Sequence, residues 1–92
     1  MPRVEKNVVV NNKKGLHARP AAMFVQIADK FDVAVTIVKG EERVNGKSIM
    51  GLLMLGAQHQ TSLKVTVEGD DAPAAMAAIE AFFAKQEEEL VS

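Results

Sequence analysis

Hydrophobic and polar residues alternate along several short stretches of the chain, a pattern typical of half-buried β-strands. In the clearest stretch, Leu63, Val65 and Val67 alternate with polar residues. The predicted strands are 4–10, 33–39, a short segment that ends near Val44, and 63–68. Because these strands have one side that is more apolar than the other, each is expected to bury one side only.

Between the strands, apolar residues recur with the spacing of amphipathic helices. The predicted helices are 18–30, 49–55 and a last one that starts at Ala72-Pro73. Pro20 marks the start of the first helix, because proline is tolerated in the first turn. Ser48 is expected at or beside the N-cap of the second helix, which Gly56 closes. Residues 86–89 of the last helix are expected to be solvated or frayed.

The resulting order of elements is β-α-β-β-α-β-α, without an internal repeat, a low-complexity segment or a linker. Strands with one apolar side imply a sheet that is covered on one face and wet on the other. We therefore expect an α+β fold, an open-faced β-sandwich in which three helices cover one face of a four-stranded antiparallel sheet. A length of 92 residues suits a single domain, residues 1–92, that buries its core without a covalent staple.

Composition narrows the possible functions. The chain has no cysteine, which excludes disulfides and thiolate metal sites. Eleven basic and twelve acidic residues leave a formal charge of −1, and tryptophan and tyrosine are absent. Neither a phosphate-neutralising groove nor a base-stacking platform for nucleic acid is therefore expected. Since the apolar stretches are too short for a membrane span, we expect a cytoplasmic protein. A self-contained core and a surface for transient partners make a monomer the expected oligomeric state.

The segment NNKKGLHARPAAMFV, residues 11–25, places His17 and Arg19 where a loop gives way to the first helix. The positive end of the helix dipole disfavours an imidazolium there, which leaves a neutral ring nitrogen free to act as a nucleophile. Once that nitrogen carries a phosphoryl group, the unpaired N–H groups of the first turn favour its negative charge. Arg19 offers the same group a planar fork of donors. Gly15 permits the backbone to pack closely before the histidine. Pro20 is expected to stiffen the segment that enters the helix, because it biases Arg19 away from the α region.

These residues, taken alone, leave simpler alternatives open. His17 could cap the helix beside a surface arginine and never react. Ser48 fits an ordinary N-cap, a position that strongly selects serine. The apolar residues Ile49, Met50 and Leu53 fit the core of a short helix as well as they fit an exposed face.

Two longer motifs carry a resemblance to a known family. GLHARPAA, residues 15–22, resembles the active-site signature of HPr, the histidine-containing phosphocarrier family of the phosphoenolpyruvate-dependent sugar phosphotransferase system. GKSIMGLLMLG, residues 46–56, resembles the family's second signature, which surrounds a regulatory serine. The spacing of the two motifs and the order of the elements also match, so the resemblance covers essentially the whole chain.

The resemblance implies that His17 accepts a phosphoryl group on Nδ1 from phosphorylated Enzyme I and passes it to the enzyme IIA components of sugar permeases. It implies that Arg19 stabilises that group, that no cofactor or metal is needed, and that the chain is a carrier rather than an independent enzyme. It also implies that Ser48 is phosphorylated by the ATP-dependent HPr kinase/phosphorylase. Three other functions stay open: a regulatory, nitrogen-type phosphorelay without sugar transport, a histidine-nucleophile phosphotransferase or hydrolase, and a purely structural binding module.

The resemblance further implies a surface for protein partners beside the histidine. The residues predicted for this surface are Ile49, Met50, Leu53 and Pro20. Leu52 and Leu55 are expected to turn inward. A phosphate on Ser48 would place charge at the rim of the surface and oppose an acidic partner such as Enzyme I.

One segment departs from the family's pattern. After Gly56 the chain reads AQHQT, residues 57–61, with Gln60 where a glycine is usual. A left-handed backbone at Gln60 would cost stability, because its side chain disfavours that conformation. His59 has no partner at metal-ligand spacing and is expected to be a solvated loop residue.

Overall fold

The structure, a computed structural model, describes residues 2–89, with side chains up to residue 85. Within these residues, four strands and three helices follow one another in the predicted order β-α-β-β-α-β-α. Their bounds are β1 Arg3–Val9, α1 Ala18–Ala28, β2 Ala34–Lys39, β3 Glu42–Asn45, α2 Ile49–Met54, β4 Ser62–Glu68 and α3 Ala72–Glu89. Every predicted element is therefore confirmed, with small differences at the ends.

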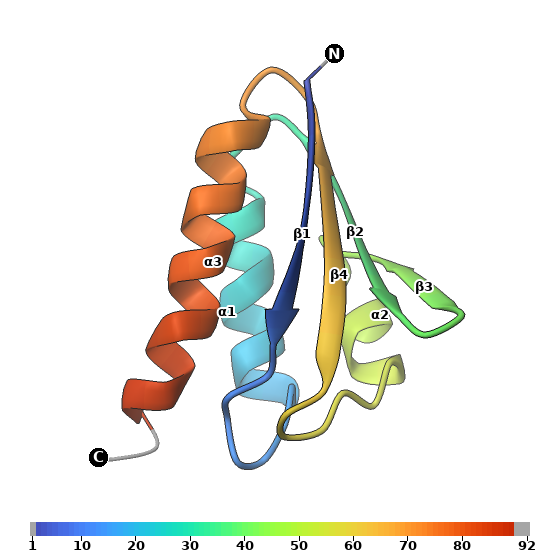
Figure 1. Cartoon of the computed structure of the whole chain (residues 1–92), viewed down its shortest axis with the longest axis vertical. Helices are drawn as coiled ribbons and strands as arrows, with labels where there is room; N and C mark the ends of the chain where they lie inside the picture. The colour runs from blue at the N-terminus through green and yellow to red at the C-terminus, as the bar shows by residue number, and fades with distance from the viewer. Residues whose placement is uncertain (1, 90–92) are drawn as a thin grey trace.

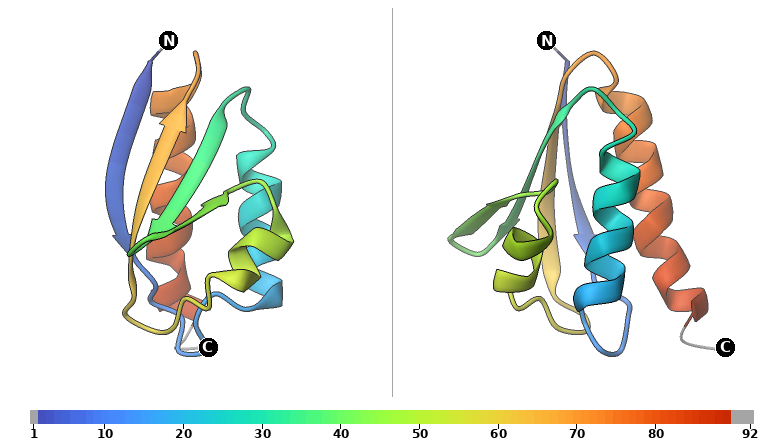
Figure 2. Two further views of the ribbon diagram at one scale, coloured as in Figure 1. Left: turned by 90° about the vertical axis from the view of Figure 1, so that its right-hand side faces the viewer. Right: turned by 180° about the vertical axis from the view of Figure 1, so that it is seen from behind.

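The four strands form one antiparallel sheet in the order β1-β4-β2-β3 (Figure 1). Val8 lies opposite Leu63, and Val35 lies opposite Val67, so the buried side chains gather on one face. The left view of Figure 2 looks onto the other face, with α1 and α3 behind the strands. The prediction of an α+β open-faced sandwich is confirmed.

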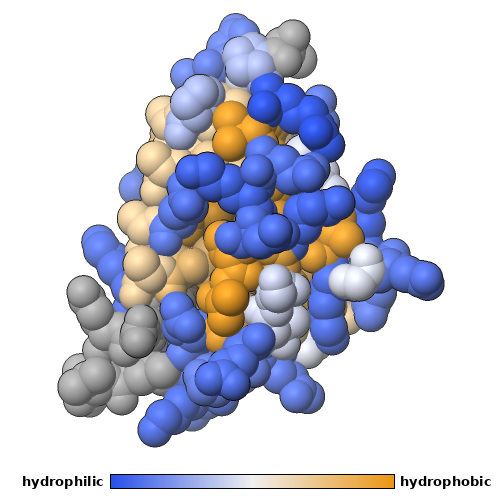
Figure 3. Space-filling view, in the orientation of Figure 1, coloured by the Kyte–Doolittle hydropathy of each residue, from blue (hydrophilic) through white to orange (hydrophobic). Residues whose placement is uncertain are grey.

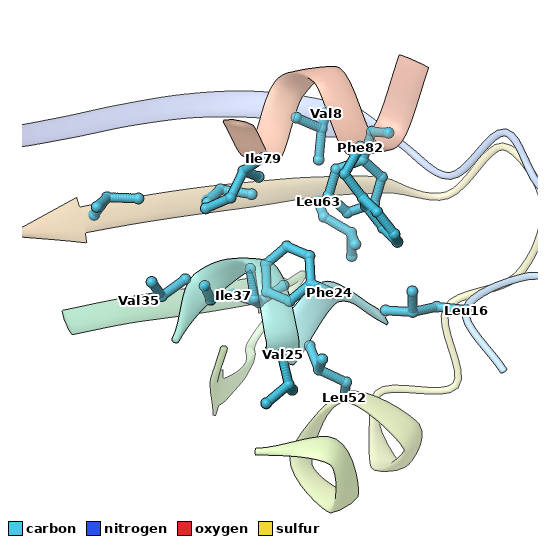
Figure 4. Packing of buried hydrophobic residues seen from close by; sticks show 14 of the residues in the cluster. Val8, Leu16, Phe24, Val25, Val35, Ile37, Leu52, Leu63, Ile79 and Phe82 are labelled. Atoms are coloured by element: carbon cyan, nitrogen blue, oxygen red, sulfur yellow. The ribbon is translucent and has the colours of Figure 1, made fainter. Parts of the chain in front are cut away.

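The covered face of the sheet and all three helices share one apolar core. Figure 4 shows Phe24, Leu52 and Leu63 converging on this core from α1, α2 and β4. The ring centroid of Phe24 lies 5.7 Å from that of Phe82 and 5.9 Å from that of Phe83. Edge-to-face and tilted pairs of this kind add to the burial energy, and here they join α1 to α3.

Helix α1 ends two residues before the predicted end at Lys30. The Lys30 N–H donates to the Ile27 carbonyl oxygen at 3.2 Å, and the Phe31 N–H donates to Ala28 at the same distance. These three-residue turns satisfy the last carbonyls of the helix while the chain turns toward β2. The apolar spacing continues to Phe31, which packs against the core. The hydrophobic pattern therefore does not report where the helix ends.

Helix α3 exposes small apolar residues on its solvent side. The exposed residues at helical spacing are Ala74, Ala77, Ala81 and Ala84. Figure 3 shows pale hydrophobic colour along the side where α3 lies. Alanine has the highest helix propensity, so these exposed residues stabilise α3 by their backbone preference although they make no contact with the core. The predicted solvation of residues 86–89 concerns side chains that lie outside the described ones. None of the helices in the described part of the chain has the length and hydropathy of a membrane span.

The turn at residues 57–61 has a left-handed backbone at a residue that carries a side chain. Gln60 has a φ of 69°, the only positive value among the described non-glycine residues. The Thr61 N–H donates to the Gln58 carbonyl oxygen at 3.0 Å, which closes the turn. The Gln60 N–H donates to the Val10 carbonyl oxygen at 2.6 Å, and this bond holds the turn beside the end of β1. Gln60 therefore bears the conformational cost that the sequence predicts for a left-handed backbone at this residue.

Replacing Gln60 with glycine should stabilise the protein. We expect Gln60→Gly to raise the free energy of unfolding by about 1 kcal/mol, because glycine removes the left-handed penalty and loses only part of this gain to backbone entropy. His59→Gly is the matched control, because His59 lies in the same turn without a positive φ. That control should lower the free energy of unfolding. Urea unfolding measures the free energy of unfolding of both variants. An equal change in Gln60→Gly and His59→Gly would contradict a left-handed penalty at Gln60.

Candidate functional site

The junction ahead of α1 is fastened to the loop that follows α2. The Leu16 N–H donates to the Ala57 carbonyl oxygen at 2.8 Å, and the Leu16 side chain is buried. Gly15 has a φ of +74°, and a β-carbon at this position would overlap the Ala57 carbonyl oxygen and lie 3.0 Å from the Gln58 Cα. Only glycine fits this close approach, which sets the direction in which the chain enters α1.

His17 is the N-cap residue of α1. Its backbone is extended, with φ −89° and ψ −172°, and its carbonyl oxygen accepts a bond from the Ala21 N–H at 2.9 Å. His17 is therefore at the N-cap position, as the simpler interpretation has it, but its imidazole makes no capping hydrogen bond. The side chain is half-buried, and the ring is not hydrogen-bonded to any described residue.

Open N–H groups follow directly after His17. The N–H groups of Ala18 and Arg19 lie in the first helical turn, where no intrahelical acceptor exists, and Pro20 has no N–H. Neither N–H group donates to another part of the described chain. Together with the helix dipole, they make the position next to the His17 ring favourable for an anion.

Arg19 lies inside α1, so the prediction that Pro20 would keep it out of the α region is wrong. The bond from the Ala21 N–H to the His17 carbonyl closes the first turn across Arg19, and it outweighs the steric effect of the proline ring. The Arg19 side chain is exposed, and its guanidinium has no hydrogen bond or ion pair with a described residue. It is therefore free to bind an anion.

Ser48 is the N-cap of α2, as predicted. Its Oγ accepts a hydrogen bond from the Gly51 N–H at 3.0 Å, and its own N–H donates to the Asn45 carbonyl oxygen at 3.1 Å. The neighbouring Lys47 Nζ donates to the Phe31 carbonyl oxygen at 3.0 Å, which ties the start of α2 to the end of α1. The Ser48 side chain is half-exposed at this helix start.

Helix α2 turns one side into the core and the other to solvent. Leu52 and Leu55 are 1% and 2% exposed, as predicted. Ile49, Met50 and Leu53 are 41%, 68% and 36% exposed. The interpretation that places these three residues in the core is therefore wrong, and the exposed surface implied by the family resemblance is present.

The structure changes the predicted partner surface at two residues. Met54 is 74% exposed and belongs to this surface, although it is not among the residues predicted for it. Its i, i+4 spacing from Met50 was the available signal. Pro20 is buried, because the first turn of α1 packs it inward, so it does not present a surface to a partner. We call the exposed residues Ile49, Met50, Leu53 and Met54 the α2 patch.

The α2 patch and His17 lie toward the same end of the molecule. Helix α1 packs against α2, and Figures 1 and 2 show α2 beside the half of α1 that contains its N-terminus. The Lys39 Nζ donates to the Leu55 carbonyl oxygen at 3.0 Å and so holds the C-terminal end of α2 against β2. A partner that covers the patch would thus be placed near the His17 junction.

Within the part of the chain that the structure describes, His17 is joined neither to a metal-ligand cluster nor to a hydrogen-bonded acid or base. Among the described residues, no three or more histidine, cysteine or carboxylate side chains are placed to share a metal ion. His59 is an exposed loop residue, as predicted. No described acid or base is hydrogen-bonded to the His17 ring to activate it.

The described part of the chain thus combines an open-faced α+β sandwich with a half-buried histidine at a helix start, unused N–H groups and an exposed arginine, an arrangement suited to binding an anion. A family model described as "PTS HPr component phosphorylation site" matches residues 4–85. The chain belongs to the HPr family of phosphocarrier proteins, which act in the phosphotransferase system.

Relatives agree over nearly the whole chain. The Phosphocarrier protein HPr of Treponema pallidum is 46% identical over 94% of this chain and 98% of its own length. The HPr-like protein Crh of Halalkalibacterium halodurans is 46% identical over 90% of this chain and 99% of its own length. The Phosphocarrier protein NPr of Shewanella violacea is 40% identical over 86% of this chain and 87% of its own length. Among solved structures, HPr-C-His from Thermoanaerobacter tengcongensis has a TM-score of 0.88 at 40% identity, and the match covers 92% of this chain and 96% of that one.

The close approach at Gly15 gives a prediction about the site's framework. Gly15→Ala should lower the free energy of unfolding by about 1–3 kcal/mol more than Gly40→Ala, because only the first substitution adds a clash. Both glycines have a positive φ, but a β-carbon at Gly40 would meet nothing within 4 Å. Chemical denaturation of the two variants measures the difference. Equal destabilisation would show that the contact with Ala57 does not constrain the loop.

Proposed function

We propose that His17 is the phosphoryl acceptor of this carrier, and that it receives the group from phosphorylated Enzyme I and passes it to enzyme IIA domains. The observation that carries the proposal is the His17 ring, which is not hydrogen-bonded and stands at the N-cap beside the open N–H groups of Ala18 and Arg19. In the first transfer, the bond from phosphorus to the donor breaks as phosphorus bonds to a nitrogen of the His17 ring, Nδ1 by family analogy. In the second transfer, that phosphorus–nitrogen bond breaks as phosphorus bonds to the acceptor protein, and the ring nitrogen is free again. The accepting nitrogen must carry no proton.

Arg19 stabilises the transferred group in this proposal. Its exposed guanidinium has no described partner, so binding a phosphoryl oxygen does not require an existing ion pair to break. A hydrogen bond between charged groups contributes about 1.5–3 kcal/mol, which is enough to orient the group and small enough to let it leave. The half-buried position of His17 leaves the group open to a second protein. We infer a carrier that forms a transient phosphohistidine, rather than an independent catalyst.

The α2 patch is the proposed docking surface for both donor and acceptor proteins. It combines two branched aliphatic side chains with two methionines, and methionine adapts its shape to different partners. Enzyme I and enzyme IIA domains would bind it in turn, which a small exposed surface permits.

Phosphorylation of Ser48 by HPr kinase/phosphorylase is the proposed regulation. The half-exposed Ser48 Oγ already accepts a bond from the Gly51 N–H, so a phosphate there would meet the positive end of α2 and leave the helix in place. It would also add charge next to Ile49 and Met50 at the edge of the α2 patch. An acidic partner would then be repelled without unfolding of the carrier.

A second candidate function is a regulatory, nitrogen-type phosphorelay without sugar transport. The observation that favours this second candidate is the 40% identity to the Phosphocarrier protein NPr of Shewanella violacea. Both candidates use His17 in the same way and differ in the acceptor. Mixing the phosphorylated chain with purified sugar-type and nitrogen-type enzyme IIA domains separates them, because the faster acceptor identifies the branch.

Incubation with Enzyme I and phosphoenolpyruvate should add one acid-labile phosphoryl group, detected by intact mass. His17→Ala should abolish this labelling. Arg19→Ala should slow the transfer about 10- to 100-fold, and Arg19→Lys should slow it less, because lysine keeps the charge without the planar fork. Labelling of the His17→Ala variant, or none in the unmodified chain, would refute the assignment. Steady hydrolysis of a small phosphate ester would instead favour a hydrolase.

Incubation with HPr kinase and ATP should give an acid-stable phosphate that is lost in Ser48→Ala. The same substitution should lower the free energy of unfolding by about 1 kcal/mol, because it removes the N-cap. Ser48→Asp should raise the carrier concentration needed for half-maximal transfer from Enzyme I. Gln26→Glu is the charge control, since it adds the same charge roughly 14 Å along α1 from His17. Similar inhibition by both variants would contradict a local effect on the α2 patch.

A further inference from the structure

We propose that Met50 and Met54 form a reversible oxidation site, at which a peroxide converts both thioethers to sulfoxides and weakens docking of the phosphoryl donor. The proposal rests on the proposed function of the α2 patch as the docking surface. It adds a second form of control, distinct from phosphorylation of Ser48, to the same helix.

The two sulfur-containing side chains on α2 are far more accessible than the other described methionines. Met50 and Met54 are 68% and 74% exposed, whereas Met76 is 1% exposed. Met23 is half-buried and packs against the core. The chain has no cysteine, so no thiol within it competes for the oxidant. Among the described methionines, peroxide should therefore oxidise Met50 and Met54 first.

The two methionines also share one surface. They are separated by four positions on α2, so their side chains are neighbours on the helix. The other residues of the α2 patch, Ile49 and Leu53, are less exposed and carry no sulfur for a peroxide to oxidise. Half of the residues in the patch can therefore change chemically while the patch keeps its position.

Each oxidation transfers one oxygen atom. The O–O bond of hydrogen peroxide breaks, one oxygen bonds to the thioether sulfur, and water leaves. The sulfur loses two electrons and the peroxide gains two. A methionine sulfoxide reductase reverses the change with a dithiol, which becomes a disulfide as water forms.

The sulfoxide changes the patch in polarity and leaves its charge unchanged. A partner that docks on an oxidised patch loses apolar contacts and must desolvate a polar oxygen at each methionine. Repulsion from a phosphate on Ser48 is electrostatic and is screened by salt. The effect of oxidation should persist at high salt, which distinguishes it from phosphorylation.

The test exposes the full chain to hydrogen peroxide and locates each sulfoxide by peptide mass mapping. Phosphoryl transfer from phosphorylated Enzyme I is then measured over a range of carrier concentrations, at low and at high salt. We expect sulfoxides at Met50 and Met54 well before Met76. We also expect about a tenfold rise in the carrier concentration for half-maximal rate, corresponding to a modest loss of docking affinity. Treatment with both epimer-specific methionine sulfoxide reductases and dithiothreitol should reverse the rise.

The matched variant is Met50→Leu combined with Met54→Leu, compared before and after peroxide with its own untreated sample. It should show less than about a twofold change, whereas Met23→Leu should respond as the unmodified chain does. Met1 is present in every variant, and thermal unfolding of the oxidised chain checks that the core is intact. Oxidation of Met76 first, or full oxidation of Met50 and Met54 without a change in concentration dependence, would overturn the proposal. Absence of transfer to the untreated chain would instead refute the proposed function.

Discussion

The end of this protein that carries His17 and the α2 patch depends on the hydrogen bond from the Leu16 N–H to the Ala57 carbonyl oxygen. This bond joins the loop before α1 to the loop after α2, and Gly15 makes the close approach possible. The β1–β4 pairing leads directly to it, because the bonds between Val10 and the turn at 57–61 continue that pairing beyond the ends of both strands. The sheet order therefore brings together a histidine and a helix that belong to different parts of the sequence.

Two helix starts in the same molecule show how an N-cap can serve opposite purposes. Ser48 uses its side-chain oxygen to satisfy the Gly51 N–H, so α2 is closed at its start and its exposed face is held in place. His17 does not cap α1 with its side chain, and the N–H groups of Ala18 and Arg19 stay available. A serine at position 17 would stabilise the helix more, because it would satisfy one of those donors. The histidine leaves that stabilisation unused, and the donors remain available to an anion bound on its ring.

Periodicity predicts most of the fold, because β1, β2 and β4 each have one side that is more apolar and every helix has a recognisable start, whereas the mostly exposed β3 shows no such alternation. It does not predict the end of α1, since Phe31 continues the apolar spacing while hydrogen bonding has already changed to three-residue turns. The site is only partly predictable. The roles of His17 and Ser48 come from motif resemblance, whereas the exposure of Met54 and the burial of Pro20 depend on how α1 and α2 pack. Local spacing on a six-residue helix cannot decide which side meets the core.

The properties required of a carrier explain why the docking surface proposed on α2 would also be chemically sensitive. A protein that passes a group between different partners needs a surface that fits each of them and releases each of them. Flexible, polarizable methionines meet this need better than branched aliphatic side chains, which hold one shape. The same flexibility requires that Met50 and Met54 stay exposed and unpacked, and exposure of a thioether is what permits its oxidation. In the proposed roles of the α2 patch, adaptability and redox sensitivity are therefore two consequences of one arrangement of side chains.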